Sequence, residues 1–301
     1  MPAYKETMQI GKFLCYLQHE KRYSPHTVQA YATDLQQFAQ FVLPDFGENL
    51  NQIGHKAIRS FIMHLMETGV SASAVNRKIS TLRSFYKYAL QSGEVRHNPM
   101  LLVRAPKMPK KLPVLVETHK LNSLLDASET FSSDFASQRD RVVLELLFGT
   151  GIRLAELLQL KDTDISLYGS SIKVLGKRHK ERIVPLHKPL LRLLQDYIQL
   201  KEKQDFNEKS RTLILTNKGT PAYPALIYRT VRHYLSQIST QSKKSPHVLR
   251  HSFATALLDG GADLNAIKEL LGHAGLAATQ VYTHSSVERI KSIYKQAHPK
   301  A

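Results

Sequence analysis

The fold of this 301-residue chain is decided by the stretch Arg104-Ala105-Pro106-Lys107-Met108-Pro109-Lys110-Lys111-Leu112-Pro113, because the sequence changes character across it. Three prolines within eight residues exclude a helix and favour an extended tether. The four cations of the stretch would repel one another unless anions lie nearby. A linker that crosses a DNA backbone supplies such anions, although an ordinary basic linker has the same composition. We therefore predict a first domain over 1–103, a linker over 104–113 and a second domain over 114–301.

The residues before the linker have the pattern of an all-helical bundle. Apolar side chains recur at helical spacing in four segments, 10–17, 28–42, 58–65 and 75–86. Ser24-Pro25 and Ser71 are favourable helix starts, and Gly69 follows the end of the third segment. The first domain is therefore predicted to consist of four helices.

The fourth of these segments also carries a polar face. Asn76, Ser80, Arg83 and Lys87 follow one another at steps of four, three and four residues, so they share one side of a helix. An ordinary solvated face would look the same. The functional alternative is a helix in a DNA groove, where Asn and Arg reach base edges and Lys reaches a phosphate.

After the linker the pattern becomes mixed. Residues 171–175 and 181–185 are predicted as two antiparallel strands around a turn at 176–180, with a further short strand at 213–216. Helices are predicted to flank them over 139–148, 154–160, 188–201, 224–238, 247–258, 264–271 and 287–297. The fold class is therefore mainly α, with a small antiparallel sheet in the C-terminal domain.

Composition restricts the partner and the compartment. Lys and Arg number 42 against 25 Asp and Glu, a net charge of +17 that favours a polyanionic partner. The single cysteine, Cys15, excludes an internal disulfide, and its apolar neighbours Phe13 and Leu17 predict a buried thiol. No apolar run approaches the ~20 residues that span a bilayer, and the first residues lack a signal-peptide pattern. We expect a cytoplasmic protein without a membrane partner.

Three segments in the second domain have residue types suited to chemistry at a DNA phosphate. Arg153 follows the turn Gly149-Thr150-Gly151 and begins a helix, a place that already favours an anion. His247 and Arg250 lie three residues apart on one face of a later helix. Guanidinium groups can bind the non-bridging oxygens of a phosphate in pairs. Because acidic residues are sparse, a metal site made of carboxylates is not expected, and no cofactor is predicted.

The third segment contains a candidate nucleophile. His273 stands between Gly272 and Ala274, and Tyr282 follows it nine residues later. A phenol has a pKa of about 10 and needs cationic neighbours before it becomes a nucleophile. A half-buried tyrosine with a local hydrogen bond is the commoner role for any single residue of this type. The order and spacing of the three segments, rather than any one of them, carry the functional prediction.

Arg153, His247-x-x-Arg250, His273 and Tyr282, in this order, resemble the signature of the tyrosine recombinases, also called the phage integrase family. The turn around Lys177 resembles the mobile lysine hairpin of that family, and the resemblance extends over almost the whole chain. It implies a helical, SAM-like core-binding domain and a catalytic domain. The chain looks most like the Xer type, XerC and XerD, and leaves open which of the two it represents.

The resemblance also implies roles. Tyr282 would attack the scissile phosphate, becoming joined to the 3′ phosphate and freeing a 5′ hydroxyl. Arg153 and Arg250 would bind the non-bridging oxygens together with His273. Lys177 would protonate the departing oxygen; Lys180 competes for this role, but Lys177 holds the family's position directly after the glycine. His247 would remove and return the tyrosine proton. A covalent phosphotyrosine conserves the bond energy, so that no ATP is required. No metal is required, because the guanidinium groups supply the charge stabilisation.

The resemblance further implies partners. Family members act on double-stranded DNA recombination sites as tetramers, formed here with a paralogue or with further copies of the chain. The Xer type implies chromosome dimer resolution and segregation, and control by a septal DNA translocase. The apolar stripe of the last helix, which includes Ile293 and Tyr294, could dock into a neighbouring subunit or pack on its own domain.

Three other functions stay open from the sequence. An integrase of a mobile element would share the chemistry, although such proteins often carry an additional N-terminal domain. A type IB topoisomerase would relax plasmids without preference for a site. A non-catalytic, site-specific DNA-binding factor could keep the same fold, although the complete set of catalytic residue types argues against it.

Overall fold

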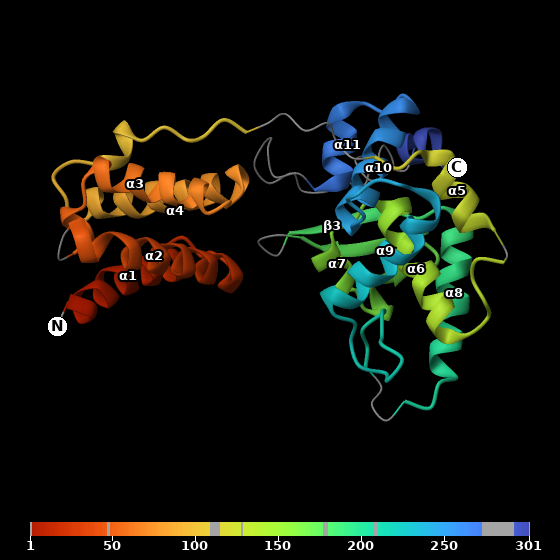
Figure 1. Cartoon of the computed structure of the whole chain (residues 1–301). Helices are drawn as coiled ribbons and strands as arrows, with labels where there is room; N and C mark the ends of the chain where they lie inside the picture. The colour runs from red at the N-terminus through yellow and green to blue at the C-terminus, as the bar shows by residue number, and fades with distance from the viewer. Residues whose placement is uncertain are drawn as a thin grey trace. The chain divides into compact units, whose positions relative to one another are not determined.

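The computed structural model describes residues 2–46, 49–108, 115–127, 129–176, 180–206, 210–272 and 292–300, with the side chains of 2–7 excepted. The chain forms two compact units, Met1–Lys111 and Leu112–Ala301. Each unit has a hydrophobic core of its own. Figure 1 shows helices in the first unit, and helices around a small sheet in the second.

The first unit contains the four predicted helices. They are α1 (Pro2–His19), α2 (Pro25–Phe46), α3 (His55–Glu67) and α4 (Ala72–Gln91), with 3₁₀ turns η1 (Leu50–Gln52) and η2 (Pro99–Leu102). The Ser71 side chain accepts a hydrogen bond from the Ala74 N–H and so caps α4, as the sequence predicts. Gly69, after α3, has a φ of 79°, a left-handed conformation that favours glycine.

A buried carboxylate joins α2 to α4. Asp34 is almost fully buried, and it accepts hydrogen bonds from Lys78 at 2.9 Å and from Thr81 at 3.0 Å. Arg77 pairs with the same carboxylate. A buried charge needs such partners, and the removal of one partner from a buried ion pair is strongly destabilising. The network therefore holds the α4 backbone in place against α2.

The prediction for Cys15 is wrong, because its side chain is exposed. Phe13 and Leu17 of α1 point into the core, and they are four residues apart on one face of the helix. Cys15 lies between them in sequence and therefore on the opposite side of the helix. Apolar neighbours in sequence did not predict the burial of Cys15 correctly, because the helical period decides which side chain is buried.

The second unit begins with α5 (Thr118–Asp126), which the sequence analysis does not predict. The other helices of the unit are α6 (Phe135–Thr150), α7 (Leu154–Gln159), α8 (Lys188–Glu202), α9 (Pro224–Ile238), α10 (Pro246–Asp259) and α11 (Leu264–Leu271). A short 3₁₀ turn, η3 (Asp162–Asp164), precedes the sheet. Residues 292–297 are helical again. Every residue from 142 to 150 is buried, so α6 is the central helix, and it packs against α8 and α10 (Figure 1).

The sheet has three antiparallel strands in the order β1 (Ile165–Ser166), β2 (Ser171–Leu175) and β3 (Glu181–Pro185). Val174 lies opposite Arg182, and Leu175 lies opposite Glu181. The strand predicted at 213–216 is not formed; among these residues only Leu215 takes part in an isolated bridge, with Pro221. Leu213, Ile214 and Leu215 are all buried, so the apolar run marks core packing rather than a strand. The predicted fold class, mainly α with a small antiparallel sheet, is confirmed.

Candidate active site

Arg153 is the N-cap residue of α7, as the sequence predicts. Gly151 makes this possible, because it ends α6 in a left-handed conformation with φ 62°. A Cβ on Gly151 would lie 2.5 Å from the Phe253 ring, so a larger residue would not fit. The Arg153 guanidinium donates to Glu156 Oε1 at 2.9 Å and to the carbonyl of Gly272 at 2.8 Å. Its side chain stays 39% exposed, which leaves part of the group open to a ligand.

Arg250 lies on α10 and is buried, with 6% of its surface exposed. Its guanidinium donates to the carbonyl of Gly151 and, at 2.8 Å, to the carbonyl of Leu271. Burial, with the nearby charge of Arg153, lowers the pKa of Arg250 to about 10. The group therefore stays protonated at neutral pH and retains its positive charge inside the unit.

A third arginine, which the sequence analysis does not single out, belongs to the same cluster. Arg182 on β3 is buried and donates to both oxygens of Glu156, each at 2.8 Å. Glu156 also accepts the backbone N–H of Arg153 at 2.8 Å. Burial acts to raise the pKa of Glu156, but its hydrogen bonds to Arg182 and Arg153 hold that pKa below its usual value. The carboxylate is therefore ionised at neutral pH.

The three arginines meet at the C-terminal end of α11. Arg182 Nε donates to the carbonyl of Leu270 at 3.1 Å, and Arg250 and Arg153 donate to the next two carbonyls, those of Leu271 and Gly272. The last carbonyls of a helix have no partner within the helix, and cations there are favoured by the helix dipole. We name Arg153, Arg182, Arg250 and Glu156 the arginine cluster. It holds the backbone at the point in the sequence directly before His273.

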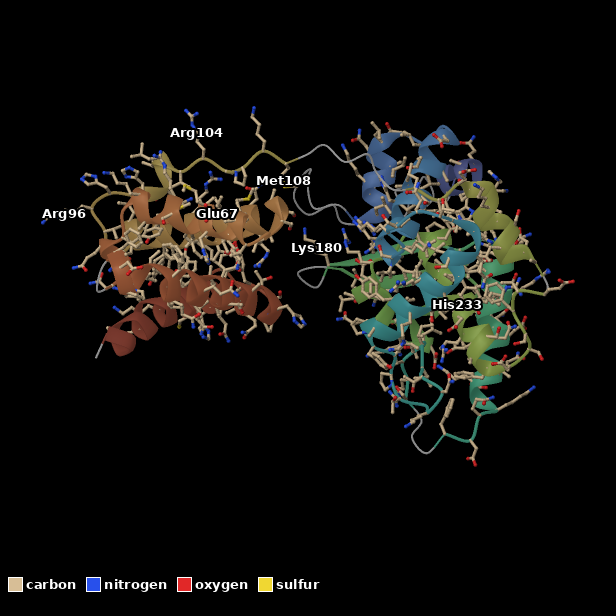
Figure 2. The ribbon with its side chains drawn as sticks, viewed as in Figure 1. Glu67, Arg96, Arg104, Met108, Lys180 and His233 are labelled. Carbon is tan, nitrogen blue, oxygen red and sulfur yellow. The ribbon has the colours of Figure 1, made fainter. Side chains whose placement is uncertain are left out.

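The β2–β3 hairpin starts beside this cluster. Gly176 donates its N–H to the carbonyl of Lys180 at 2.7 Å and so closes the turn. A Cβ on Gly176 would lie 3.7 Å from the Arg182 guanidinium and 3.8 Å from the Glu156 carboxylate. Lys180 is exposed at this end of the sheet (Figure 2). Lys177, the predicted acid, lies outside the described residues, and Gly176, which precedes it in sequence, lies next to the cluster.

His247 is in the first turn of α10, with its side chain exposed. The pKa of His247 is lowered, first because the ring is partly shielded from water and then because Arg250 carries a positive charge nearby. A neutral imidazole at physiological pH can accept a proton, as the role suggested by the resemblance requires. His273 and Tyr282 lie outside the described residues.

The predicted DNA-contacting face of α4 is only partly free. Ser80, Arg83 and Lys87 are exposed, but the Arg83 guanidinium donates to the carbonyl of Val103 at 3.4 Å. The Asn76 side chain donates to the carbonyl of Pro106 at 3.1 Å. Two of the four candidates therefore hold the chain that follows η2 along α4.

The start of the predicted linker presents its cations to solvent. Lys107 is exposed, and the side chain of Arg104 points away from the helices of the first unit (Figure 2). Lys110 and Lys111 lie outside the described residues. DNA contact by any of these candidates stays a prediction.

In the described part of the chain, the side chains form no cluster of His, Cys, Asp or Glu that could hold a metal ion. Within the same residues, no helix is long and apolar enough to cross a bilayer.

The end of the chain packs on its own unit. Tyr294 and His298 are buried, and both bond to the carbonyl of Gly149 near the end of α6, at 2.7 and 2.9 Å. Lys300 pairs with Glu145 at 2.7 Å. Val287 and Ile290, which the sequence places on the same stripe, lie outside the described residues. The predicted docking of this helix into a neighbouring subunit is not tested by a single chain and stays a prediction.

The buried histidines of this region predict acid sensitivity. The His298 ring accepts the Lys300 N–H at Nδ1, so it is neutral with its proton on Nε2, and burial lowers its pKa to about 4. Burial likewise lowers the pKa of the adjacent His187 to about 3. The unfolded chain takes up these protons at about pH 6.5, so the free energy of unfolding decreases as pH falls from there towards 4. The slope is at most about 1.4 kcal/mol per pH unit for each histidine.

Urea unfolding at pH 7.5 and 5.0 measures this effect. We expect His298→Gln to lose less stability than the wild type between these pH values, because the amide can still donate to Gly149 but cannot titrate. Equal losses in both proteins would contradict the assignment.

Comparison with protein families gives a match over both units. Residues 115–289 match the phage integrase family, and residues 10–93 match the phage integrase N-terminal SAM-like domain. The chain belongs to the phage integrase family. The predicted SAM-like and catalytic domains are thereby confirmed, and the arginine cluster lies in the part that matches the catalytic family model.

Curated relatives within this family are tyrosine recombinases of the Xer type. Tyrosine recombinase XerC of Chlorobaculum parvum is 36% identical, with 97% of this chain and 94% of that protein covered. Tyrosine recombinase XerD of Staphylococcus haemolyticus is 35% identical, with 97% and 99% covered. This integrase-family chain is therefore an Xer-like tyrosine recombinase, an enzyme that breaks and rejoins DNA. The two identities are nearly equal and do not favour XerC over XerD.

Solved structures of other recombinases share the fold. A crystal structure of the XerH site-specific recombinase bound to palindromic difH substrate, a post-cleavage complex, has a TM-score of 0.72 at 24% identity, covering 95% of this chain and 83% of that one. A lambda integrase dimer bound to a COC′ core site has a TM-score of 0.66 at 19% identity, covering 91% and 98%.

Proposed function

We propose that this chain recombines DNA at a specific site through Tyr282, with a role in chromosome dimer resolution and segregation. The observation that carries the proposal is the convergence of Arg153 and Arg250 at the end of α11. Both donate to consecutive backbone carbonyls there, and the candidate nucleophile follows ten residues after Gly272 in the sequence. Two guanidiniums at one point suit a phosphate whose charge increases in the transition state.

The proposed reaction transfers a phosphoryl group from the 5′ oxygen of the DNA to the Tyr282 oxygen. The Tyr282 oxygen forms a bond to phosphorus while the bond from phosphorus to the 5′ oxygen breaks. Arg153, Arg250 and His273 stabilise the non-bridging oxygens, and the proton that leaves the phenol passes to His247. Lys177 donates a proton to the departing 5′ oxygen. Religation reverses these transfers, so that no ATP is consumed.

DNA would be held by both units in this proposal. Lys87 and Ser80 of α4 are exposed on the predicted contact face, and Lys107 is exposed on the segment that follows η2. The net charge of +17 supports a substrate with many phosphates. Four copies, or two copies with two of a paralogue, would assemble on two sites in the cytoplasm, where a septal DNA translocase could control them.

Recovery of the covalently attached DNA from chromatin tests the biological part of the proposal. Protein would be purified under denaturing conditions, and the DNA joined to Tyr282 would be sequenced. One chromosomal locus supports chromosome dimer resolution. Fragments that map to the ends of a mobile element would instead identify an integrase, and relaxation of a plasmid without a site would identify a topoisomerase.

Cleavage is expected to need no divalent metal. Guanidinium groups supply the positive charge that a metal ion would otherwise bring to the phosphate. Formation of the protein–DNA adduct on a nicked suicide substrate should therefore proceed at the same rate with and without excess EDTA. A rate that falls in EDTA and recovers with Mg²⁺ would reject this mechanism.

A further inference from the structure

We propose that Arg182 is a positioning residue, which neutralises Glu156 and thereby leaves the charge of Arg153 available to the scissile phosphate. The inference rests on the proposed function and adds to it a residue for which the sequence analysis gives no role. Arg182 does not touch the substrate in this account. It acts through the carboxylate that it shares with Arg153.

The contacts of Glu156 carry the first step. Arg182 occupies both carboxylate oxygens at 2.8 Å, whereas the Arg153 guanidinium reaches one of them at 2.9 Å. Both side chains of the ion pair between Arg182 and Glu156 are buried, whereas the Arg153 side chain is 39% exposed. Arg182 is therefore the main partner of Glu156, and Arg153 is the guanidinium with surface left for a ligand.

The charge of the arginine cluster carries the second step. Three guanidiniums and one carboxylate leave two positive charges. Attack of a tyrosine oxygen that has lost its proton on a phosphodiester gathers two negative charges around phosphorus, so the cluster matches the charge of that state. Without Arg182, the carboxylate would be free to form a two-point ion pair with Arg153, and one positive charge would remain.

Arg182 also has a backbone contact, which suggests a purely structural alternative. Its Nε donates to the carbonyl of Leu270 at 3.1 Å, and a Cβ on Gly272 would lie 3.3 Å from its guanidinium. A residue that served only to anchor the end of α11 would be needed whatever the charge of Glu156. The two roles therefore differ in how they depend on residue 156.

A double-mutant cycle separates the two roles. The variants are Arg182→Gln, Glu156→Gln and the combination of both, assayed for adduct formation in a single turnover on a nicked suicide substrate. We expect Arg182→Gln to lower the rate by about tenfold or more, with affinity for the site unchanged. The double variant again has two positive charges, and we expect it to be at least about fivefold faster than Arg182→Gln.

One further variant and one further measurement control for stability. Arg139→Gln removes another buried arginine, one that bonds to Asp140 and Asn217 outside the cluster, and should leave the rate unchanged. Thermal unfolding of each variant shows whether it is folded. If Arg182→Gln alone does not fold, the double variant decides, because it buries no unpaired charge and should cleave within about tenfold of the wild type.

The outcomes are distinct. A wild-type rate in Arg182→Gln overturns the inference, and so does a folded double variant that is no faster than Arg182→Gln. Either result leaves the proposed function intact as long as the wild type forms the adduct. Failure of the wild type to form any adduct would reject the proposed function itself.

Discussion

Tyr282→Phe is expected to bind its DNA site with unchanged affinity and to form no covalent protein–DNA adduct. The substitution removes only the phenolic oxygen, the atom that we propose is joined to phosphorus. The attack needs an oxygen in line with the bond that breaks, and phenylalanine supplies none. A nicked suicide substrate that traps the adduct, analysed on a denaturing gel, measures the loss directly.

Two controls make this result decisive. A gel-shift titration of the same variant shows that the site is still bound, so that the loss belongs to chemistry and not to recognition. Tyr294, twelve residues later in the sequence, serves for comparison, because its hydroxyl bonds to the carbonyl of Gly149 and is buried. An adduct formed by Tyr282→Phe would show that a different residue is the nucleophile.

The second large effect is expected from Arg153→Gln, which should slow cleavage by about a hundredfold or more. The Arg153 side chain is 39% exposed, and we propose that its guanidinium binds a non-bridging oxygen. Glutamine is polar but carries no charge. The fold should survive the change, since Arg182 keeps both oxygens of Glu156 paired. The measurement is the single-turnover rate of adduct formation at saturating protein.

The matched control is Arg192→Gln, which removes the same charge from an exposed position on α8. Both variants have the same net charge, so a general loss of attraction to DNA would affect them equally. We expect Arg192→Gln to cleave at the wild-type rate. Equal rates in the two variants would show that Arg153 contributes only to general attraction.

Local sequence signals were sufficient for most of the secondary structure. The Ser-Pro and Ser starts placed α2 and α4, because capping and the fixed φ of proline act within one turn of a helix. The boundaries of α9 and α11 agree with the prediction to the residue. The apolar pattern gave a wrong prediction where the run of apolar residues was short. Residues 213–215 of the predicted strand 213–216 are buried without forming a strand, and so short an apolar run does not distinguish a strand from other core packing.

Arg182 shows what sequence reasoning missed at the site. A usable signal existed, because strand β3 alternates and Arg182 shares its inward face with Val184. A cation at an inward position requires a buried partner. That partner could not be read from the strand itself, since Glu156 lies on α7, 26 residues earlier.

By itself the sequence determined most of the helices, the hairpin, the family and the order of the candidate catalytic residues, because these depend on neighbours within a few positions or on whole motifs. Only the tertiary structure decided which charges meet. Arg153 reaches a carbonyl 119 residues away, and Arg250 reaches one 99 residues away. Such contacts depend on how α7, α10 and α11 pack. Periodicity along the chain contains no information on the packing between helices, and it is this packing that brings three guanidiniums to one helix end.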